Sequence, residues 1–194
     1  MTGGTAQARL LEAAARVFGR HGAAGTTTRR VADEAGVNEV TLFRLFKSKD
    51  ALLDAAVHAC TEHASSARLP MQPVDPEAEL TSWCAGEISR LRSAAGLLRH
   101  CFAESALKRG HTREAGSVVA HRAEELMAYI KRLEHLAPLA ANDEEREDAV
   151  IALVSMLTSD ALGRESMPQI YTSPRIDAPR RYARFFLRAI GWKL

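Results

Sequence analysis

The chain has 194 residues, of which 46% are hydrophobic and 26% charged, and this balance excludes a disordered or collagen-like chain. The formal net charge of +2 is unevenly spread, because residues 1–50 hold eight Lys and Arg against five Asp and Glu, whereas the remainder holds 18 against 19. No stretch approaches the roughly 20 apolar residues of a membrane span and no signal-peptide pattern is present, so we expect a cytoplasmic protein.

An amphipathic helix is the first element that the sequence predicts. Apolar residues recur at helical spacing from Leu10 to Phe18, and Gly22 is expected to end the helix. Its apolar face predicts packing against the segment that follows. A basic first quarter of the chain favours a nucleic-acid-binding head on a near-neutral body.

Residues 27–46 predict two short helices joined by a tight turn. Thr27 is a good N-cap for the first of them, and Gly36 stops it because glycine adopts the left-handed conformation at little cost. Asn38 caps the second, which runs to about Phe46. This pattern is typical of a helix-turn-helix, whose second helix enters the DNA major groove.

The second of these helices divides into two faces. Leu42 and Phe46 are spaced i, i+4 and are expected to face inward. The other sides carry Glu39, Val40, Thr41, Phe43, Arg44 and Leu45. Such a partly apolar face suits base edges, since a thymine methyl takes an apolar contact and guanine an arginine. Lys47 and Lys49 follow and suit phosphate oxygens. From spacing alone, a plain helical hairpin with ordinary surface charges remains an alternative.

The rest of the chain predicts a helical body. A fourth helix follows Ser48, and residues 68–76, with three prolines, form the expected domain boundary. Further helices are predicted at about 76–91, 113–136, 142–162 and 177–190, and Gly96 and Gly110 punctuate an apolar segment between the first two of these. The last two are apolar on more than one face, so they are buried either in the monomer core or in a subunit interface.

The sequence offers little catalytic or metal-binding chemistry. Cys60, Cys84 and Cys101 are widely spaced, which favours reduced thiols over a zinc site. There is no phosphate-binding glycine loop, zinc-type histidine pair or nucleophile elbow. We therefore expect no enzyme activity, no catalytic residues, no metal site and no cofactor.

The ordered motifs of residues 8–57 resemble the DNA-binding domain of the TetR family of transcriptional regulators. The matching positions are Phe18 and Gly22, then Ala35, Gly36 and Val37, then Thr41, Leu42 and Phe43, and finally Phe46, Ser48 and Lys49. The resemblance implies an all-α fold, with a three-helix helix-turn-helix domain at residues 1–60 and a helical ligand-binding and dimerisation domain at residues 61–194.

The resemblance also implies which side chains contact a double-stranded DNA operator. These are Thr28, Arg29, Glu39, Val40, Thr41, Phe43, Arg44 and Lys49. Phe43 replaces the family's usual tyrosine, which removes a hydroxyl that would bond phosphate, and Leu45 replaces a frequent histidine. Glu39 either accepts from a cytosine amine or repels phosphate.

For the body, the resemblance implies a homodimer formed by the last two helices and a pocket for an apolar or amphipathic effector. Trp83, Phe102, Met127 and Met156 are the candidate pocket residues, although each fits core packing as well. The chain is thus expected to be a ligand-responsive repressor that binds a palindromic operator. Two alternatives are a sequence-tolerant architectural DNA-binding protein and an enzyme on a regulator-like fold.

Overall fold

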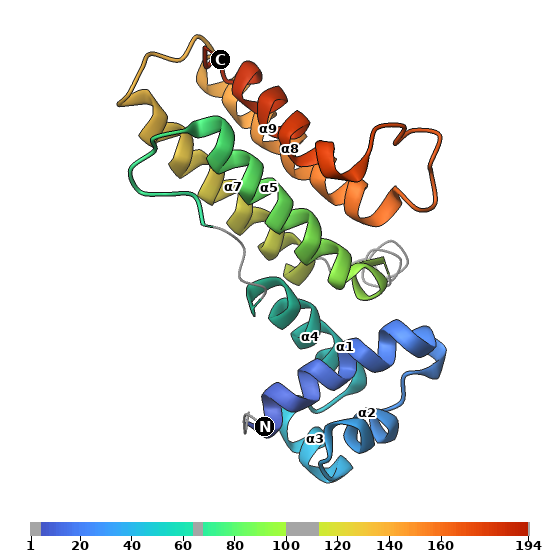
Figure 1. Ribbon diagram of the computed structural model, residues 1–194. Helices are drawn as coiled ribbons and strands as arrows, with labels where there is room; N and C mark the ends of the chain where they lie inside the picture. Colours follow the sequence, from blue (N-terminus) through green and yellow to red (C-terminus); the bar gives the residue numbers. More distant parts are fainter. Residues whose placement is uncertain (1–4, 64–67, 100–112, 194) are drawn as a thin grey trace. The chain divides into compact units, whose positions relative to one another are not determined.

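The computed structural model describes residues 5–63, 68–99 and 113–193, and all regular elements in these ranges are helical (Figure 1). This confirms the predicted all-α class. The chain forms two compact units: unit 1 comprises residues 1–64 and 93–116, and unit 2 comprises residues 65–92 and 117–194. Within the described ranges no helix is long and apolar enough to cross a membrane.

Unit 1 is built on α1 (Ala6–Gly25), which packs against α2 (Thr28–Ala35) and α4 (Lys49–His63). The short α3 (Glu39–Phe46) contacts all three of these helices. Leu10, Val17, Val31, Leu42 and Leu52 are almost fully buried between them, so one apolar core holds the helix-turn-helix in place.

The end of α1 differs slightly from the sequence prediction. Gly22 adopts a φ of 63°, so the regular helix breaks there as predicted, but a further helical stretch continues to Gly25. Thr26, buried in the connection to α2, donates a 2.7 Å hydrogen bond to the carbonyl of Gly22. This contact fixes the path from α1 into α2.

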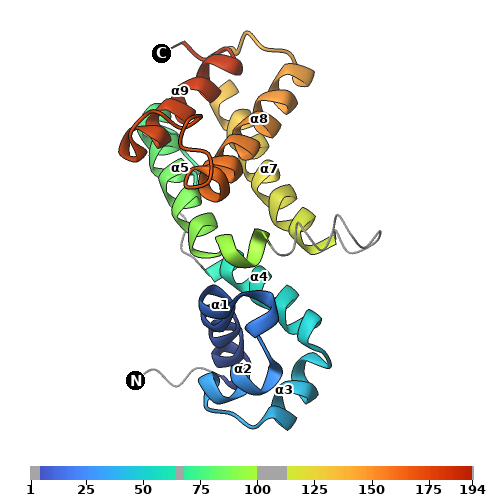
Figure 2. The ribbon, with the colours of Figure 1, turned by 90° about the vertical axis from the view of Figure 1, so that its right-hand side faces the viewer.

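Unit 2 contains most of α5 (Pro76–Ser93) and α7 (Arg113–Glu134), with α8 (Asp143–Gly163), η1 (Arg175–Asp177) and α9 (Ala178–Ala189) (Figure 2). Its core is centred on the fully buried side chains of Trp83, Tyr129, Leu153 and Phe186. Tyr129 donates a hydrogen bond to Glu79, which joins α7 to α5.

The start of α8 has the predicted capping box. The side chain of Asn142 accepts from the backbone N–H of Glu145 at 3.0 Å, and the Glu145 carboxylate accepts from the backbone N–H of Asn142 at 2.7 Å. Two otherwise unpaired donors are satisfied in this way.

Cys84 is buried and free, and burial raises the pKa of its thiol, which stays protonated. Cys101 lies outside the described residues.

Candidate nucleic-acid interface

The helix-turn-helix of unit 1 has the caps that the sequence predicted. The side chain of Thr27 accepts from the backbone N–H of Arg30 at 3.2 Å, and the side chain of Asn38 accepts from the backbone N–H of Val40 at 2.8 Å. Gly36 ends α2 in the left-handed conformation, with a φ of 63°. These local bonds set both ends of the turn, so the direction of α3 follows from the sequence.

The two faces of α3 are as predicted. Leu42 is fully buried and Phe46 nearly so, whereas Val40 is 73% exposed, Phe43 46% and Leu45 40%. An eight-residue helix with three large exposed apolar side chains is unusual for a surface that meets only water. A contact surface explains this exposure better than solvation does.

The N-termini of α2 and α3 are joined directly. Thr28 donates a 2.5 Å hydrogen bond from Oγ1 to Oε1 of Glu39, and both side chains are half-buried. Sequence reasoning placed both residues in the interface but did not find this bond, because they are eleven positions apart. Thr41, also half-buried, lies on α3 about one turn before the exposed Arg44.

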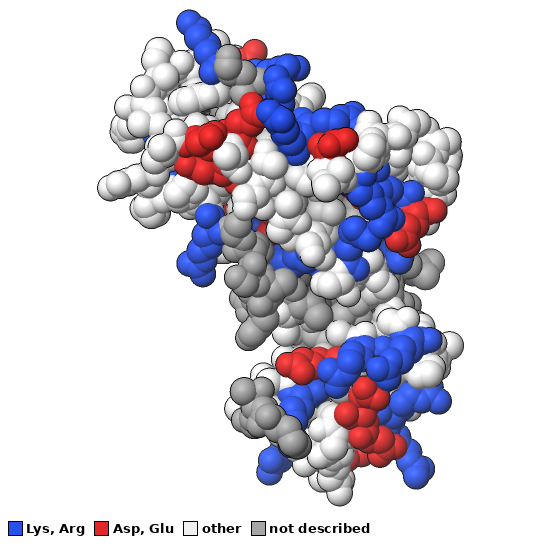
Figure 3. Space-filling model, viewed as in Figure 1, with Lys and Arg blue, Asp and Glu red and all other residues white. Residues whose placement is uncertain are grey.

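The cations of unit 1 have different roles. Arg29 and Arg44 are exposed, and Lys49 is half-buried at the start of α4, whose first turn is capped by Ser48. In contrast, Arg16 and Arg20 of α1 both contact Glu34 of α2, at 3.0 and 3.4 Å. Figure 3 shows this interleaving of Lys and Arg with Asp and Glu on the visible face of unit 1. Formal charge alone therefore overestimates the positive surface that is open to DNA.

Lys47, between α3 and α4, adopts a φ of 64° and is the sole described non-glycine residue with a positive φ. Its backbone N–H donates to the carbonyl of Phe43 at 2.9 Å, which ends α3. Residues other than glycine rarely adopt this backbone conformation, so the backbone at Lys47 is strained. No sequence pattern signals this conformation.

The candidate pocket residues are spread through unit 2. Trp83 is fully buried and lines a small cavity between α5, α7 and α8. Met127 and Met156 are half-buried, and neither lines that cavity. Phe102 lies outside the described residues. Beside Trp83, sequence reasoning missed the charged residues Glu87 and Arg90, which are 2% and 3% exposed.

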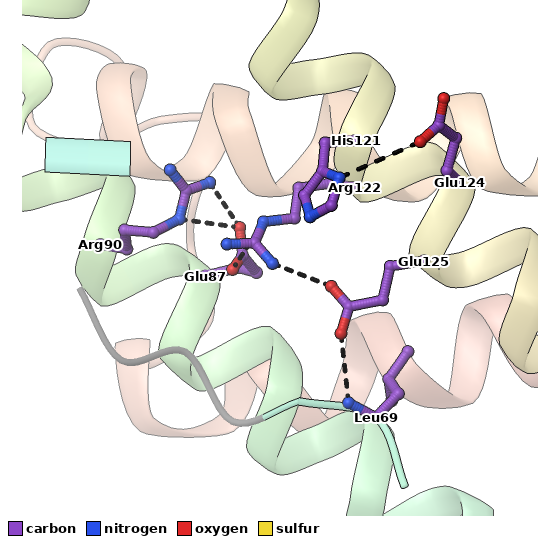
Figure 4. A network of polar contacts seen from close by, with 7 residues as sticks. All are labelled: Leu69, Glu87, Arg90, His121, Arg122, Glu124 and Glu125. Carbon is purple, nitrogen blue, oxygen red and sulfur yellow. Dashed lines mark hydrogen bonds and ion pairs between the residues drawn. The ribbon is translucent and has the colours of Figure 1, made fainter. Parts of the chain in front are cut away.

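These charged residues belong to a network that links α5 to α7 (Figure 4). Arg90 donates to Oε2 of Glu87 at 3.0 and 2.5 Å, and Nε of Arg122 lies 3.3 Å from Oε1 of the same carboxylate. Arg122 also contacts Glu125 at 2.8 Å, and Glu125 accepts from the backbone N–H of Leu69 at 3.2 Å. Buried charges in the middle of a helical body give no periodic signal that sequence reasoning could use.

Comparison with known proteins agrees with this geometry. Residues 10–56 match the family model described as bacterial regulatory proteins, tetR family. The helix-turn-helix therefore lies in a segment that is similar to the tetR family. Over 58 residues it is 38% identical to the uncharacterized HTH-type transcriptional regulator YvkB of Bacillus subtilis (strain 168), a match that covers 30% of this chain and 29% of that relative.

Solved structures extend the similarity of fold to the whole chain. A transcriptional regulator from Rhodococcus sp. Rha1 is 19% identical with a TM-score of 0.75, covering 98% of this chain and 100% of that one. A TetR transcription regulator from Haloarcula marismortui is 17% identical with a TM-score of 0.74, covering 95% and 97%. Salmonella enterica GusR is 18% identical with a TM-score of 0.73, covering 95% of each chain. The similarity of fold therefore covers the body as well as the helix-turn-helix.

Proposed function

We propose that this chain is a cytoplasmic, DNA-binding transcriptional regulator of the TetR family, and specifically a repressor whose operator affinity responds to a small molecule. The observation that carries the proposal is the exposed face of α3, where Val40, Phe43 and Leu45 remain uncovered. The helix itself is capped at its N-terminus and packed on the core by its opposite face. If α3 lay in the major groove, thymine methyl groups and sugars of the DNA would cover the exposed face.

The interface residues divide by role in this proposal. Val40, Thr41 and Arg44 lie on α3 and contact base edges, whereas Arg29, Phe43 and Lys49 contact the backbone. Thr28 supports this arrangement through its hydrogen bond to Glu39. Phe43 lacks the hydroxyl of a tyrosine, so its contribution is limited to apolar contact with the sugar-phosphate backbone.

We propose further that the protein is a homodimer formed through α8 and α9. Ile151 of α8 is 62% exposed and Phe185 of α9 is 48% exposed, although both helices also bury apolar residues inside unit 2. A second copy that packed on these side chains would remove them from water. A twofold axis also makes the surface self-complementary, as an isologous interface requires.

DNase footprinting on the DNA that flanks the protein's own gene tests the proposal. We expect a protected site with dyad symmetry, because two recognition helices related by a twofold axis contact two half-sites about 34–36 Å apart or a multiple of that distance. Competition with unrelated DNA separates a regulator from an architectural protein. A specificity ratio near one would contradict the proposed function.

A further inference from the structure

The buried cavity beside Trp83 has a specific hydrogen-bonding character. It measures about 20 Å³, and its apolar wall is formed by Leu91, Val154 and Leu157. A cavity of about 10–15 Å³ is enough to hold one water molecule, so this cavity has room for a single group of that size. Trp83, Glu87 and Arg90, all at most 3% exposed, form the polar side.

Two buried polar atoms of the residues that line this cavity have no hydrogen-bond partner in the described part of the chain. The Nε1–H of Trp83 donates to no described residue, and Oε1 of Glu87 accepts no hydrogen bond, although Nε of Arg122 lies 3.3 Å from it. The other oxygen of Glu87 already accepts twice from Arg90. Thr158, which also lines the cavity, donates its hydroxyl to the carbonyl of Val154 at 2.8 Å. One donor and one acceptor therefore remain to be satisfied.

Charges of both signs already surround the cavity. Among the described residues, the carboxylates of Glu87 and Glu125 contact the guanidinium groups of Arg90 and Arg122. A ligand anion would approach the buried carboxylate of Glu87, and a ligand cation would approach two guanidinium groups. Burial of an additional unpaired charge is costly, whereas a neutral group that both accepts and donates matches the two free atoms.

We propose that this cavity is the polar end of the effector site and that it binds the hydroxyl group of an otherwise apolar alcohol. The hydroxyl oxygen accepts from Nε1–H of Trp83, and its proton is donated to Oε1 of Glu87. Val154 and Thr158 also line an open groove of about 570 Å³ on α8, which provides an apolar surface for the body of the molecule. The inference rests on the proposed ligand response and names the chemical class of the ligand.

Matched eight-carbon probes test the ligand class without DNA. In a Trp192→Phe background, Trp83 is the single tryptophan, so its emission reports occupancy of the cavity. We expect 1-octanol to change this emission with an affinity at least about tenfold higher than that of octanoate or octylamine. The carboxylate of octanoate would be repelled by Glu87, and the ammonium group of octylamine would leave the Nε1–H of Trp83 without an acceptor. Equal or tighter binding of octanoate, or no response to any probe, would overturn the inference.

Two variants separate the polar match from simple apolar binding. Glu87→Gln removes the negative charge that Arg90 and Arg122 share, so octanoate should gain at least about tenfold relative to 1-octanol. Thr81→Val on α5 also removes a hydroxyl that is bonded to a backbone carbonyl, but Thr81 lines neither the cavity nor the groove, so this variant should leave the probe preference unchanged. If Glu87→Gln does not fold, as judged by circular dichroism, Trp83→Phe measured by calorimetry replaces it and should lower the 1-octanol affinity toward that of octane.

Operator binding then distinguishes this inference from the proposed function. If 1-octanol binds at Trp83 and changes operator affinity, both hold. If it binds but operator affinity is unchanged, the site exists while the proposed ligand response is wrong. Failure of all probes at Trp83, with specific operator binding intact, contradicts the inference alone.

Discussion

Thr28 and Glu39, the first residues of α2 and α3, are joined by a 2.5 Å hydrogen bond between their side chains. The bond joins the N-terminal ends of the two helices. It occupies one oxygen of the carboxylate and so restrains the orientation of Glu39. The acidic side chain therefore links the two helices, and we expect its charge to repel phosphate.

We expect Glu39→Gln to raise affinity for operator and unrelated DNA by a similar factor of about 2–10, because the amide oxygen keeps the bond to Thr28 while the repulsion is removed. Binding titrations on operator variants provide the measurement. Thr28→Val, the matched control, removes the bond but not the charge and should weaken binding. A change in preference at a single base pair with Glu39→Gln would instead indicate that Glu39 contacts a cytosine.

Arg29 and Lys49 are expected to set the salt dependence of DNA binding. Each lost phosphate contact should lower the slope of log affinity against log salt concentration by about one unit. Arg29→Ala and Lys49→Ala are compared with Lys131→Ala, which removes an exposed cation from α7 in unit 2. If Lys49→Ala behaves like the control, its assignment to phosphate is wrong.

Because the backbone of Lys47 is strained, two variants at this position should differ in stability but not in DNA binding. Lys47→Gly relieves the cost of a φ of 64°, so it should be about 1 kcal/mol more stable than Lys47→Ala. Both variants remove the same charge and should weaken DNA binding equally. Urea unfolding combined with salt-dependent binding checks both effects, and equal stability of the two variants would show that the backbone is not strained.

The sequence predicted most of unit 1, because its determinants are local. Thr27, Gly36 and Asn38 act within a few residues of their positions, and the i, i+4 pair of Leu42 and Phe46 selects the buried face of α3. The caps and helix faces of this unit are confirmed. The roles of individual DNA-contacting residues remain predictions, since contacts with a partner depend on atoms outside the chain.

Unit 2 was less predictable because its polar core depends on contacts between distant residues. Glu87 and Arg122 are 35 positions apart, and Tyr182 reaches Asp160 across the connection from α8 to α9. Helical periodicity predicts the helices themselves, but it treats charged residues such as these as surface residues. Only the packed structure shows that they are enclosed and paired.

Asp160 is expected to contribute to the pH dependence of stability. Burial by itself would raise the pKa of its carboxyl, but hydrogen bonds from Arg164 and Tyr182 outweigh burial and hold the pKa below its ordinary value. The ionised form thus stabilises the folded protein above the unfolded pKa, and this contribution is lost as the pH falls through the folded pKa. The acidic range is where the effect should appear.

Asp160→Asn should therefore lower the free energy of unfolding at pH 7 and reduce its decrease on acidification. Urea titrations at pH 7, 5 and 3.5 measure both quantities. Asp148→Asn, an exposed change on the same helix, is the matched control and should behave like the wild type. If the wild type and Asp160→Asn lose stability in parallel as the pH falls, the ion pair does not control the acid response.

The exposed apolar residues of α8 and α9 predict how the protein associates. Ile151→Asp or Phe185→Asp should place a charge in the proposed dimer interface, where it would be buried without a partner, and should shift the protein to a monomer in sedimentation experiments. Val74→Asp changes an equally apolar residue that is 89% exposed in the loop before α5, and it should leave the dimer intact. Because each monomer carries one recognition helix, a monomeric variant should bind a single half-site and lose the dyad footprint, while unit 1 keeps its fold. A variant that becomes monomeric yet still protects both half-sites with wild-type affinity would show that α8 and α9 do not set the operator geometry.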